Sequence, residues 1–324
     1  MPRKIEISHR TIIFTVFFLL LLWFLYFIRD IITQFFIAIL VMVTLNPFVI
    51  RLTKLKIPRP LAIVMVYILL FLGLGLLIAV IARPLVEQTA NFASTLPAYL
   101  DTFNIPAFLQ EGATREITVF IGTMPSQILR IGISAFSNVI NIFTVLTFSF
   151  YLLLARQKLG GQLKSFFGSK KAQEIEVSVN EMEKKLGGWA RGQLMLMFLV
   201  GLATFVGLKI LGFPFVLPLS LLAGLLEIVP VLGPVLAAIP AIIIGLSISP
   251  LIGLAAVALS FLIQQLEANI LVPKVMEKSL GLSPIITLLA IIIGLKTGSI
   301  VGALLSIPVV ITLQIAGKEF WKRK

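Results

Sequence analysis

Three ionisable residues interrupt otherwise apolar stretches in the C-terminal third of this 324-residue chain. They are Glu227 in Leu225–Pro240 (LLEIVPVLGPVLAAIP), Glu267 in Phe261–Pro273 (FLIQQLEANILVP) and Lys296 in Leu288–Pro308 (LLAIIIGLKTGSIVGALLSIP). A charge in hydrocarbon costs about 2.5 to 3.5 kcal/mol on insertion scales, and an unpaired backbone polar group also costs several kcal/mol. Such stretches are stable only where they pack against protein or line a wet cavity. Transport pathways through membranes are built from polar segments of this kind.

The first acid stands beside a concentrated break in the helical pattern. Glu227 precedes Pro230 by three residues and the Gly233-Pro234 pair by six. Because proline donates no backbone hydrogen bond, the break leaves carbonyl oxygens free beside a carboxylate. That combination suits a proton or a cation, and we expect Glu227 to bind one of them. The alternative is that Glu227 caps the broken helix or pairs with Lys296 for a structural reason.

The second acid belongs to a polar cluster within an apolar helix. The cluster consists of Gln264, Gln265, Glu267 and Asn269, and the stretch ends at Pro273. At about 100° per residue, Gln265 and Asn269 share one helix face, whereas Gln264 and Glu267 form a neighbouring face. Such a broad stripe suits the wall of a cavity that hydrogen-bonds a polar ligand. The alternative is that these side chains hydrogen-bond to neighbouring helices.

The lysine stands in a glycine-flanked segment. Lys296 lies in GLKTG, between Gly294 and Gly298, where glycine allows a sharp turn and a close approach of other backbone. We expect Lys296 to neutralise Glu227 or Glu267, or to respond to their protonation. The alternative is that its charged end reaches the membrane interface and has no partner in the protein.

The composition places the chain among membrane proteins. Hydrophobic residues make up 59% of the chain and charged residues 13%, and the mean hydropathy is +1.08. These values are too apolar for a soluble fold. The net charge of +13 comes from basic residues beside the apolar runs, where they set topology and meet anionic lipid headgroups. We therefore predict the lipid bilayer as a partner and no nucleic acid.

Several chemistries are excluded by what the chain lacks. It has no cysteine and a single histidine, His9, so neither a disulfide nor a Cys/His metal site can form. No zinc-protease motif, serine nucleophile motif or phosphate-binding GxxxxGK[ST] segment is present, which argues against a hydrolase and against ATP as the energy source. We predict that the chain is not an enzyme and holds no cofactor, apart from a transported or coupling Na⁺ or H⁺.

The apolar runs predict an all-α, polytopic integral membrane protein with about six crossings. The following runs can each cross a core about 30 Å thick as a helix: Thr11–Ile28, Ile31–Ile50, Leu61–Ala82, Ala135–Ala155, Gly192–Leu211 and Leu251–Leu271. Two longer, interrupted regions, Phe215–Leu246 and Ile285–Ala316, are expected to form re-entrant helical hairpins, which in secondary transporters meet at the substrate site. The alternative is that each of them crosses the membrane once.

We interpret residues 1–324 as a single transmembrane domain. Its parts are the first three spans (1–82), an external amphipathic segment (83–133), a fourth span (134–155), a cytoplasmic amphipathic segment (156–191), a core with both hairpins (192–317) and a basic tail (318–324). The positive-inside rule places the basic segments Arg51–Pro60 and Arg156–Arg191 in the cytoplasm, together with both termini. The amphipathic segments are expected to form helices along the membrane surface or against a neighbour.

Four segments resemble the autoinducer-2 exporter (AI-2E) family of multi-span membrane proteins. They are WARGQ (Trp189–Gln193), GLLEIVPVLGPVLAAIPA (Gly224–Ala241), QQLEANILVPKVM (Gln264–Met276) and LSPIITLLAIIIGLKTGSIVGALLSIPV (Leu282–Val309). The resemblance implies a location in the inner (plasma) membrane and export of a small hydrophilic molecule, with autoinducer-2 as one example. It also implies Na⁺ or H⁺ antiport in some members, and a homo-oligomer for which a pentamer is one form.

Three classes of function follow from these features. The leading prediction is a secondary transporter that moves a small polar solute by alternating access, with the two hairpins as gates and the polar cluster around Glu267 as a wall. A Na⁺/H⁺ antiporter of the same family is an alternative, and an oligomeric channel or membrane scaffold is another. An enzyme working inside the membrane is disfavoured because two acids alone make a poor hydrolytic set.

Overall fold

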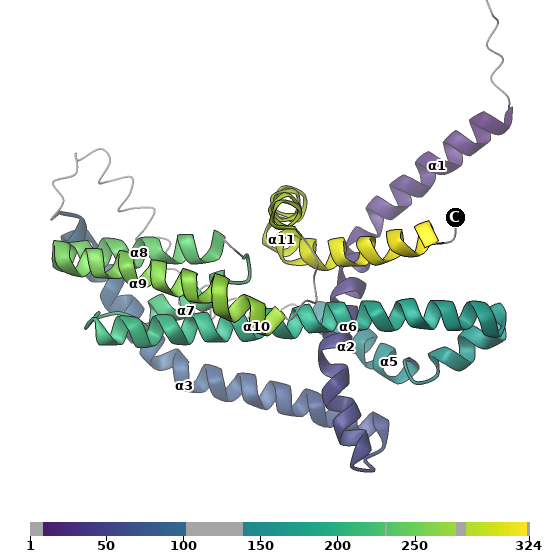
Figure 1. Cartoon of the computed structure of the whole chain (residues 1–324), viewed down its shortest axis with the longest axis horizontal. Coiled ribbons are helices and arrows are strands. Elements are labelled where there is room, and N and C mark those ends of the chain that lie inside the picture. Colours follow the sequence, from purple (N-terminus) through teal and green to yellow (C-terminus); the bar gives the residue numbers. More distant parts are fainter. Residues whose placement is uncertain (1–8, 102–138, 231, 277–282, 323–324) are drawn as a thin grey trace, which may run out of the picture.

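The computed structural model describes residues 9–101, 139–230, 232–276 and 283–322, and every regular element in these ranges is a helix (Figure 1). The helices are α1 (His9–Phe27), α2 (Arg29–Lys54), α3 (Arg59–Asp101), α5 (Val139–Ala155), α6 (Leu159–Ile210), α7 (Val216–Leu226), α8 (Leu232–Ile248), α9 (Pro250–Leu266), a π-helix (Glu267–Leu271), α10 (Val272–Met276) and α11 (Pro284–Lys322). The predicted all-α class is confirmed. Most of the predicted external segment 83–133 lies outside the described residues.

Six helical segments in the described part are long and apolar enough to cross a membrane. They are His9–Phe27, Arg29–Lys54, Arg59–Gln88, Leu159–Ile210, Pro250–Met276 and Val301–Lys318. Five of them coincide with predicted crossings. The sixth, Val301–Lys318, is the second arm of a region that we expected to be a hairpin, whereas the predicted crossing Ala135–Ala155 corresponds to α5, a shorter helix of 17 residues.

The predicted cytoplasmic segment 156–191 and the crossing that follows it are parts of one helix. The 52-residue α6 departs from helical geometry at Gly168, whose φ of 74° and ψ of 166° bend its N-terminal end. Beyond that bend the helix continues to Ile210. The sequence shows a change from charged to apolar residues near residue 191, but that change alters what surrounds the helix and not its backbone.

Both interrupted regions contain a break between two helical arms. The first consists of α7 and α8, joined through residues 227–231. The second lies within α11, where Gly298 (φ −137°, ψ 19°) and Ser299 (φ 54°, ψ −143°) turn the chain, so that Figure 1 shows the first arm end-on and the second across the view. The predicted interruptions are present, and insertion of these units into the bilayer as re-entrant hairpins stays a prediction.

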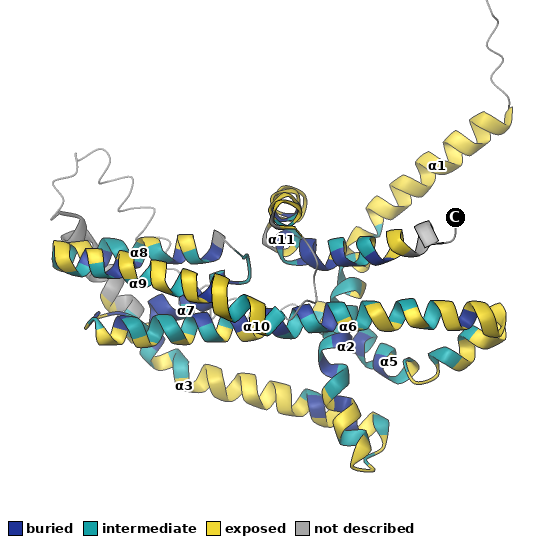
Figure 2. Ribbon diagram, in the orientation of Figure 1, coloured by how far each residue is buried: buried dark blue, intermediate teal, exposed yellow. Residues whose placement is uncertain are grey.

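Two hydrophobic clusters hold the helices together. One joins α2, α3, α5, α6 and the second arm of α11, around Val49, Ile63, Leu153, Leu186 and Ile311. The other joins the C-terminal end of α6 to α7, α8 and α9. Most other apolar residues of the described part are exposed or half-buried, and α1 has no buried residue at all (Figure 2). This distribution fits helices whose outer surfaces face lipid, because lipid and not water surrounds a membrane protein.

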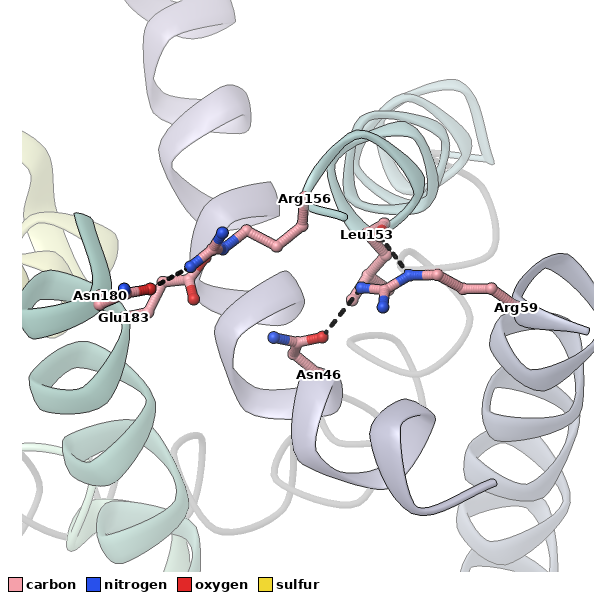
Figure 3. Close-up of polar contacts among 6 residues, drawn as sticks. All are labelled: Asn46, Arg59, Leu153, Arg156, Asn180 and Glu183. Atoms are coloured by element: carbon pink, nitrogen blue, oxygen red, sulfur yellow. Dashed lines mark hydrogen bonds and ion pairs between the residues drawn. The ribbon is translucent and has the colours of Figure 1, made fainter. Parts of the chain in front are cut away.

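A polar network fixes one end of α2, α3, α5 and α6 (Figure 3). The Arg59 guanidinium donates to the Leu153 carbonyl at 2.9 Å and to the Asn46 side chain at 3.3 Å. The Arg156 guanidinium forms an ion pair with Glu183 and a hydrogen bond with Asn180, both on α6. Because charge-assisted hydrogen bonds are the stronger kind, this network anchors α6 against its neighbours.

Candidate functional site

The two buried acids meet in the interior. Glu227 follows α7 as its C-cap, and Glu267 is the first residue of the π-helix. Glu227 is fully buried and Glu267 is 8% exposed. The two carboxyl groups are close enough to influence each other electrostatically, and Glu227 Oε1, Glu227 Oε2 and Glu267 Oε2 have no hydrogen-bond partner among the described residues. The sequence analysis expected both acids at one solute site, but not that these side chains, 40 positions apart, would be direct neighbours.

The break after α7 places the first acid. The helix ends at Leu226, and the chain turns back so closely that a Cβ atom on Gly233 would lie 2.0 Å from the Leu226 carbonyl oxygen. Only glycine, which has no Cβ, allows this approach. Gly233 is buried, and Pro230 and Pro234 are half-buried around it. The residues predicted to form the break therefore hold Glu227 at the end of a helix inside the protein.

A π-helix places the second acid. Pro273 has no N–H to donate to the carbonyl four residues before it, so the regular α-helical ladder cannot continue through Asn269. The backbone hydrogen bonds here reach one residue further back than in an α-helix. The N–H of Val272 donates to the carbonyl of Glu267, five residues back. Short π-helices within α-helices occur often at functional sites. The sequence reasoning missed this element, although Pro273, six residues after Glu267, was a signal for it.

A glutamine on α6 supports the acid pair from a third side. The Nε2 of Gln193 donates to the backbone carbonyl of Glu227 at 2.6 Å, and the side chain is buried. Its Oε1 has no hydrogen-bond partner among the described residues, and the same holds for Nε1 of the buried Trp189, one turn earlier. Gln193 was quoted within the WARGQ segment but was not among the candidate site residues. A buried amide in an apolar span was the available signal.

The other candidate residues lie outside this interior site. Gln264 is half-buried, while Gln265, Asn269 and Pro273 are exposed. The Asn269 amide donates to the Gln265 carbonyl at 2.9 Å, which confirms that these two residues share a face. That face points away from the buried acid, so the polar cluster does not form a single wall around Glu267.

The lysine does not join the acids. Lys296 is exposed, and among the described residues it forms no ion pair with either acid. Gly298, at the turn of α11, is also exposed. The expectation that Lys296 neutralises Glu227 or Glu267 is therefore wrong for this conformation. The physical reason is that the turn at Gly298 is exposed, whereas Glu227 is fully buried.

Two cavities follow each other along α6 near the acid pair. The larger one, about 350 Å³, is lined by Gln193 and by Ile228, the residue after the buried Glu227, and none of its described lining residues is charged. The smaller one, about 30 Å³, lies between α6, α7, α8 and α9 and is lined by Ala223 and Ile263. These two residues stand one helical turn before the two acids, and neither acid lines either cavity itself.

The arrangement restricts what the acids can bind. Two neighbouring carboxylates repel each other when both are charged. A buried charge without compensation costs about 3 to 5 kcal/mol. A proton on either acid, or a cation beside them, would relieve this repulsion. Among the described residues, no lysine or arginine forms an ion pair with either acid.

Comparison with known proteins supports a transport role for this architecture. Residues 12–322 match the family described as AI-2E family transporter. The chain is 29% identical to YueF of Bacillus subtilis (strain 168) over 88% of its own length and 83% of the relative's, and 26% identical to YrrI of the same organism over 95% and 93%. Both names propose a transport role. It is also 27% identical to the AI-2 transport protein TqsA of Escherichia coli (strain K12), over 90% and 86% of the two lengths.

Proposed function

Since this chain belongs to the AI-2E transporter family and is a multi-pass membrane protein, we propose that it is a secondary transporter whose coupling ion binds between Glu227 and Glu267. The transported molecule is a small polar solute such as autoinducer-2, moved outward by alternating access. The coupling ion is H⁺ or Na⁺. The cell's inner (plasma) membrane is the expected location, with both termini in the cytoplasm.

One observation carries the coupling proposal, namely two neighbouring buried carboxyl groups of which three oxygen atoms have no hydrogen-bond partner among the described residues. Such a pair is stable when it holds a proton or a cation and is strained when it holds neither. Ion release is therefore favoured only when a rearrangement admits water to the acids. This condition ties ion exchange to a change of conformation, which is the requirement for a coupled transporter.

The elements around the pair support a moving role for it. Glu227 ends one helix at a break and Glu267 begins a π-helix, so both acids sit where the backbone ladder is already interrupted. Interruptions of this kind let segments rotate with little loss of hydrogen bonding. A small rotation of α7 and α8 against α9 would separate the carboxyl groups and open the pair toward one cavity or the other.

The uncharged lining of the larger cavity favours an uncharged solute. Its lining is mainly apolar, with Thr44, Trp189 and Gln193 among the lining residues. A charged solute would meet no opposite charge there and would lose its hydration without compensation. An uncharged solute with a few hydroxyl groups, the kind of molecule that TqsA is named for, has a lower cost of entry.

Exchange of Na⁺ for H⁺ without another solute is the second candidate function. The specific observation in its favour is that one acid pair could hold either ion, so that the two compete for the same oxygen atoms. In that case sodium alone would release protons from the pair. An oligomeric channel is the remaining alternative, because a polar break inside a membrane bundle can also line a pore.

The test uses purified protein in sealed lipid vesicles, with labelled autoinducer-2 and labelled sodium as separate probes. We expect Glu227→Gln and Glu267→Gln to abolish the response of flux to an imposed pH or sodium gradient, because a neutral amide cannot release an ion. Glu174→Gln, at an exposed acid on α6, serves as the matched control. If both interior variants keep gradient-driven flux, the coupling proposal is wrong, and if flux neither saturates nor shows counterflow, the protein is a channel.

A further inference from the structure

The smaller cavity contains hydroxyl groups beside an otherwise apolar wall. Thr204 on α6 and Ser260 on α9 both line it. Each hydroxyl already donates to a carbonyl of its own helix, Thr204 to Val200 at 2.9 Å and Ser260 to Ala256 at 2.9 Å. A hydroxyl oxygen that donates in this way keeps lone pairs for a further donor. Two hydrogen-bond acceptors from different helices therefore face one small space.

The size of this cavity matches water. A buried water needs about 10 to 15 Å³ of cavity volume and two to four polar partners. A volume of about 30 Å³ accommodates roughly two waters and excludes a larger solute. The hydroxyl oxygens of Thr204 and Ser260 supply acceptors, and each water also bonds to the next. The cavity is therefore suited to water and to a proton carried by water, and not to the transported molecule.

The acids stand one helical turn from this space, and neither of them is among its lining residues. Helical side chains lean toward the N-terminal end of their helix and cover the preceding turn. Ala223 and Ile263, which line the cavity, stand in that turn before Glu227 and Glu267. The carboxyl oxygens Oε1 and Oε2 of Glu227 are buried and have no donor among the described residues. Unpaired acceptors one helical turn from a water-sized, hydroxyl-lined space can accept a hydrogen bond from water that reaches them.

We propose that this cavity holds a short file of water that carries protons between the Glu227–Glu267 pair and the solution beyond the Ile210 end of α6. Thr204 and Ser260 are positioning residues that orient the file. A proton moves from one water to a carboxylate oxygen while that water takes a proton from its neighbour, so charge and atoms balance. The positive-inside rule places the Ile210 end outside the cell, which makes this the external access route. The proposal rests on the proposed coupling role of the acid pair.

Water access can be measured without any transport assay, because the chain has no cysteine of its own. Ser260→Cys places a thiol in the cavity with little change of volume. The probe is Ag⁺, a cation small enough to follow water, which binds thiolate and protects it from a maleimide added after unfolding. Ser306→Cys is the control, because Ser306 also bonds to a carbonyl of its own helix and does not line this cavity, although Ser306 is buried and Ser260 is half-buried.

We expect Ag⁺ to protect Ser260→Cys and to leave Ser306→Cys open to the maleimide. Equal labelling of the two variants overturns the proposal, whatever flux the Glu→Gln variants show. Protection of Ser260→Cys combined with unchanged coupling in the Glu→Gln variants would support the water file and refute the coupling role of the pair. The failure of one proposal is thus distinguishable from the failure of the other.

The functional arm measures proton uptake into vesicles that contain a pH-sensitive dye. Thr204→Val keeps the side-chain shape and removes the hydroxyl, and Thr312→Val is its control, because the Thr312 hydroxyl also bonds four residues back, to Pro308 on α11, away from the cavity. We expect Thr204→Val to slow proton uptake about tenfold, the effect on a rate of losing one hydrogen bond. Solute counterflow, which needs no net proton movement, should stay unchanged. Proton uptake equal to that of Thr312→Val would show that the hydroxyl orients no water file.

Discussion

Gly233→Ala tests whether the break after α7 sets the position of the acid pair. The added Cβ would lie 2.0 Å from the Leu226 carbonyl oxygen, 2.4 Å from the Leu226 carbonyl carbon and 2.9 Å from the Glu227 nitrogen. All three are backbone atoms, so no flexible side chain can move away to make room. To restore a contact of about 3 Å, the two sides of the break must separate by at least about 1 Å.

That displacement acts directly on the site. Glu227 follows Leu226, so a shift of about 1 Å at the break moves its carboxyl group away from Glu267 by a similar distance. Misplacement by about 1 Å can cost on the order of 100-fold in the rate of a process that needs defined geometry. Overpacking of this kind also costs about 1 to 3 kcal/mol of stability. We therefore expect gradient-driven flux to fall by about 100-fold while the protein still assembles.

The assay is gradient-driven sodium or autoinducer-2 flux in vesicles, normalised to the fraction of protein that elutes as a folded species in detergent. The matched control is Gly298→Ala, at the other helix break, where no described atom lies within 4 Å of the position of the new Cβ and φ is −137°. Flux of Gly233→Ala within about twofold of that of Gly298→Ala would refute the reasoning, because the clash would then be relieved without moving the acids.

Three further predictions concern the surroundings of the site. Gln193→Leu leaves the Glu227 carbonyl without its 2.6 Å donor and should lower the free energy of unfolding in a denaturant titration by about 1 to 3 kcal/mol. Arg156→Glu should destabilise by about 1 to 3 kcal/mol because its ion pair with Glu183 is only 15% and 17% exposed, and adding Glu183→Arg should recover most of the loss in the same titration. Lys296→Gln should leave vesicle flux within about twofold of wild type, because this lysine is exposed and unpaired with either acid.

The local features of the site could be predicted from the sequence because they depend on residues that are close together in the chain. Proline and glycine near Glu227 mark the helix break, and an acid in an apolar run marks a position that cannot face lipid. Both acids proved to be buried. The apolar runs likewise located most of the long helices, because length and hydropathy alone decide whether a helix can span a bilayer.

The long-range features could not be predicted in the same way. The proximity of Glu227 and Glu267 depends on how the α7–α8 unit packs against α9, and that packing cannot be read from one sequence. The bond from Gln193 joins residues 34 positions apart, and the exposure of Lys296 depends on the direction of the α11 turn. Periodicity places a residue on a face of its own helix, whereas the neighbour of that face is decided by tertiary structure.

The uninterrupted stretch of α6 beyond Gly168 has a mechanical consequence. At about 1.5 Å per residue, the 24 residues between Ser169 and Gln193 extend about 36 Å from the acid pair. If this stretch tilts as a stiff rod, a rotation of about 5° near Gln193 swings its far end by about 3 Å. A movement too small to resolve at the acid pair is thereby amplified at a distance. A pair of spin labels near that end would report, as a change in separation, which state of the cycle each molecule occupies.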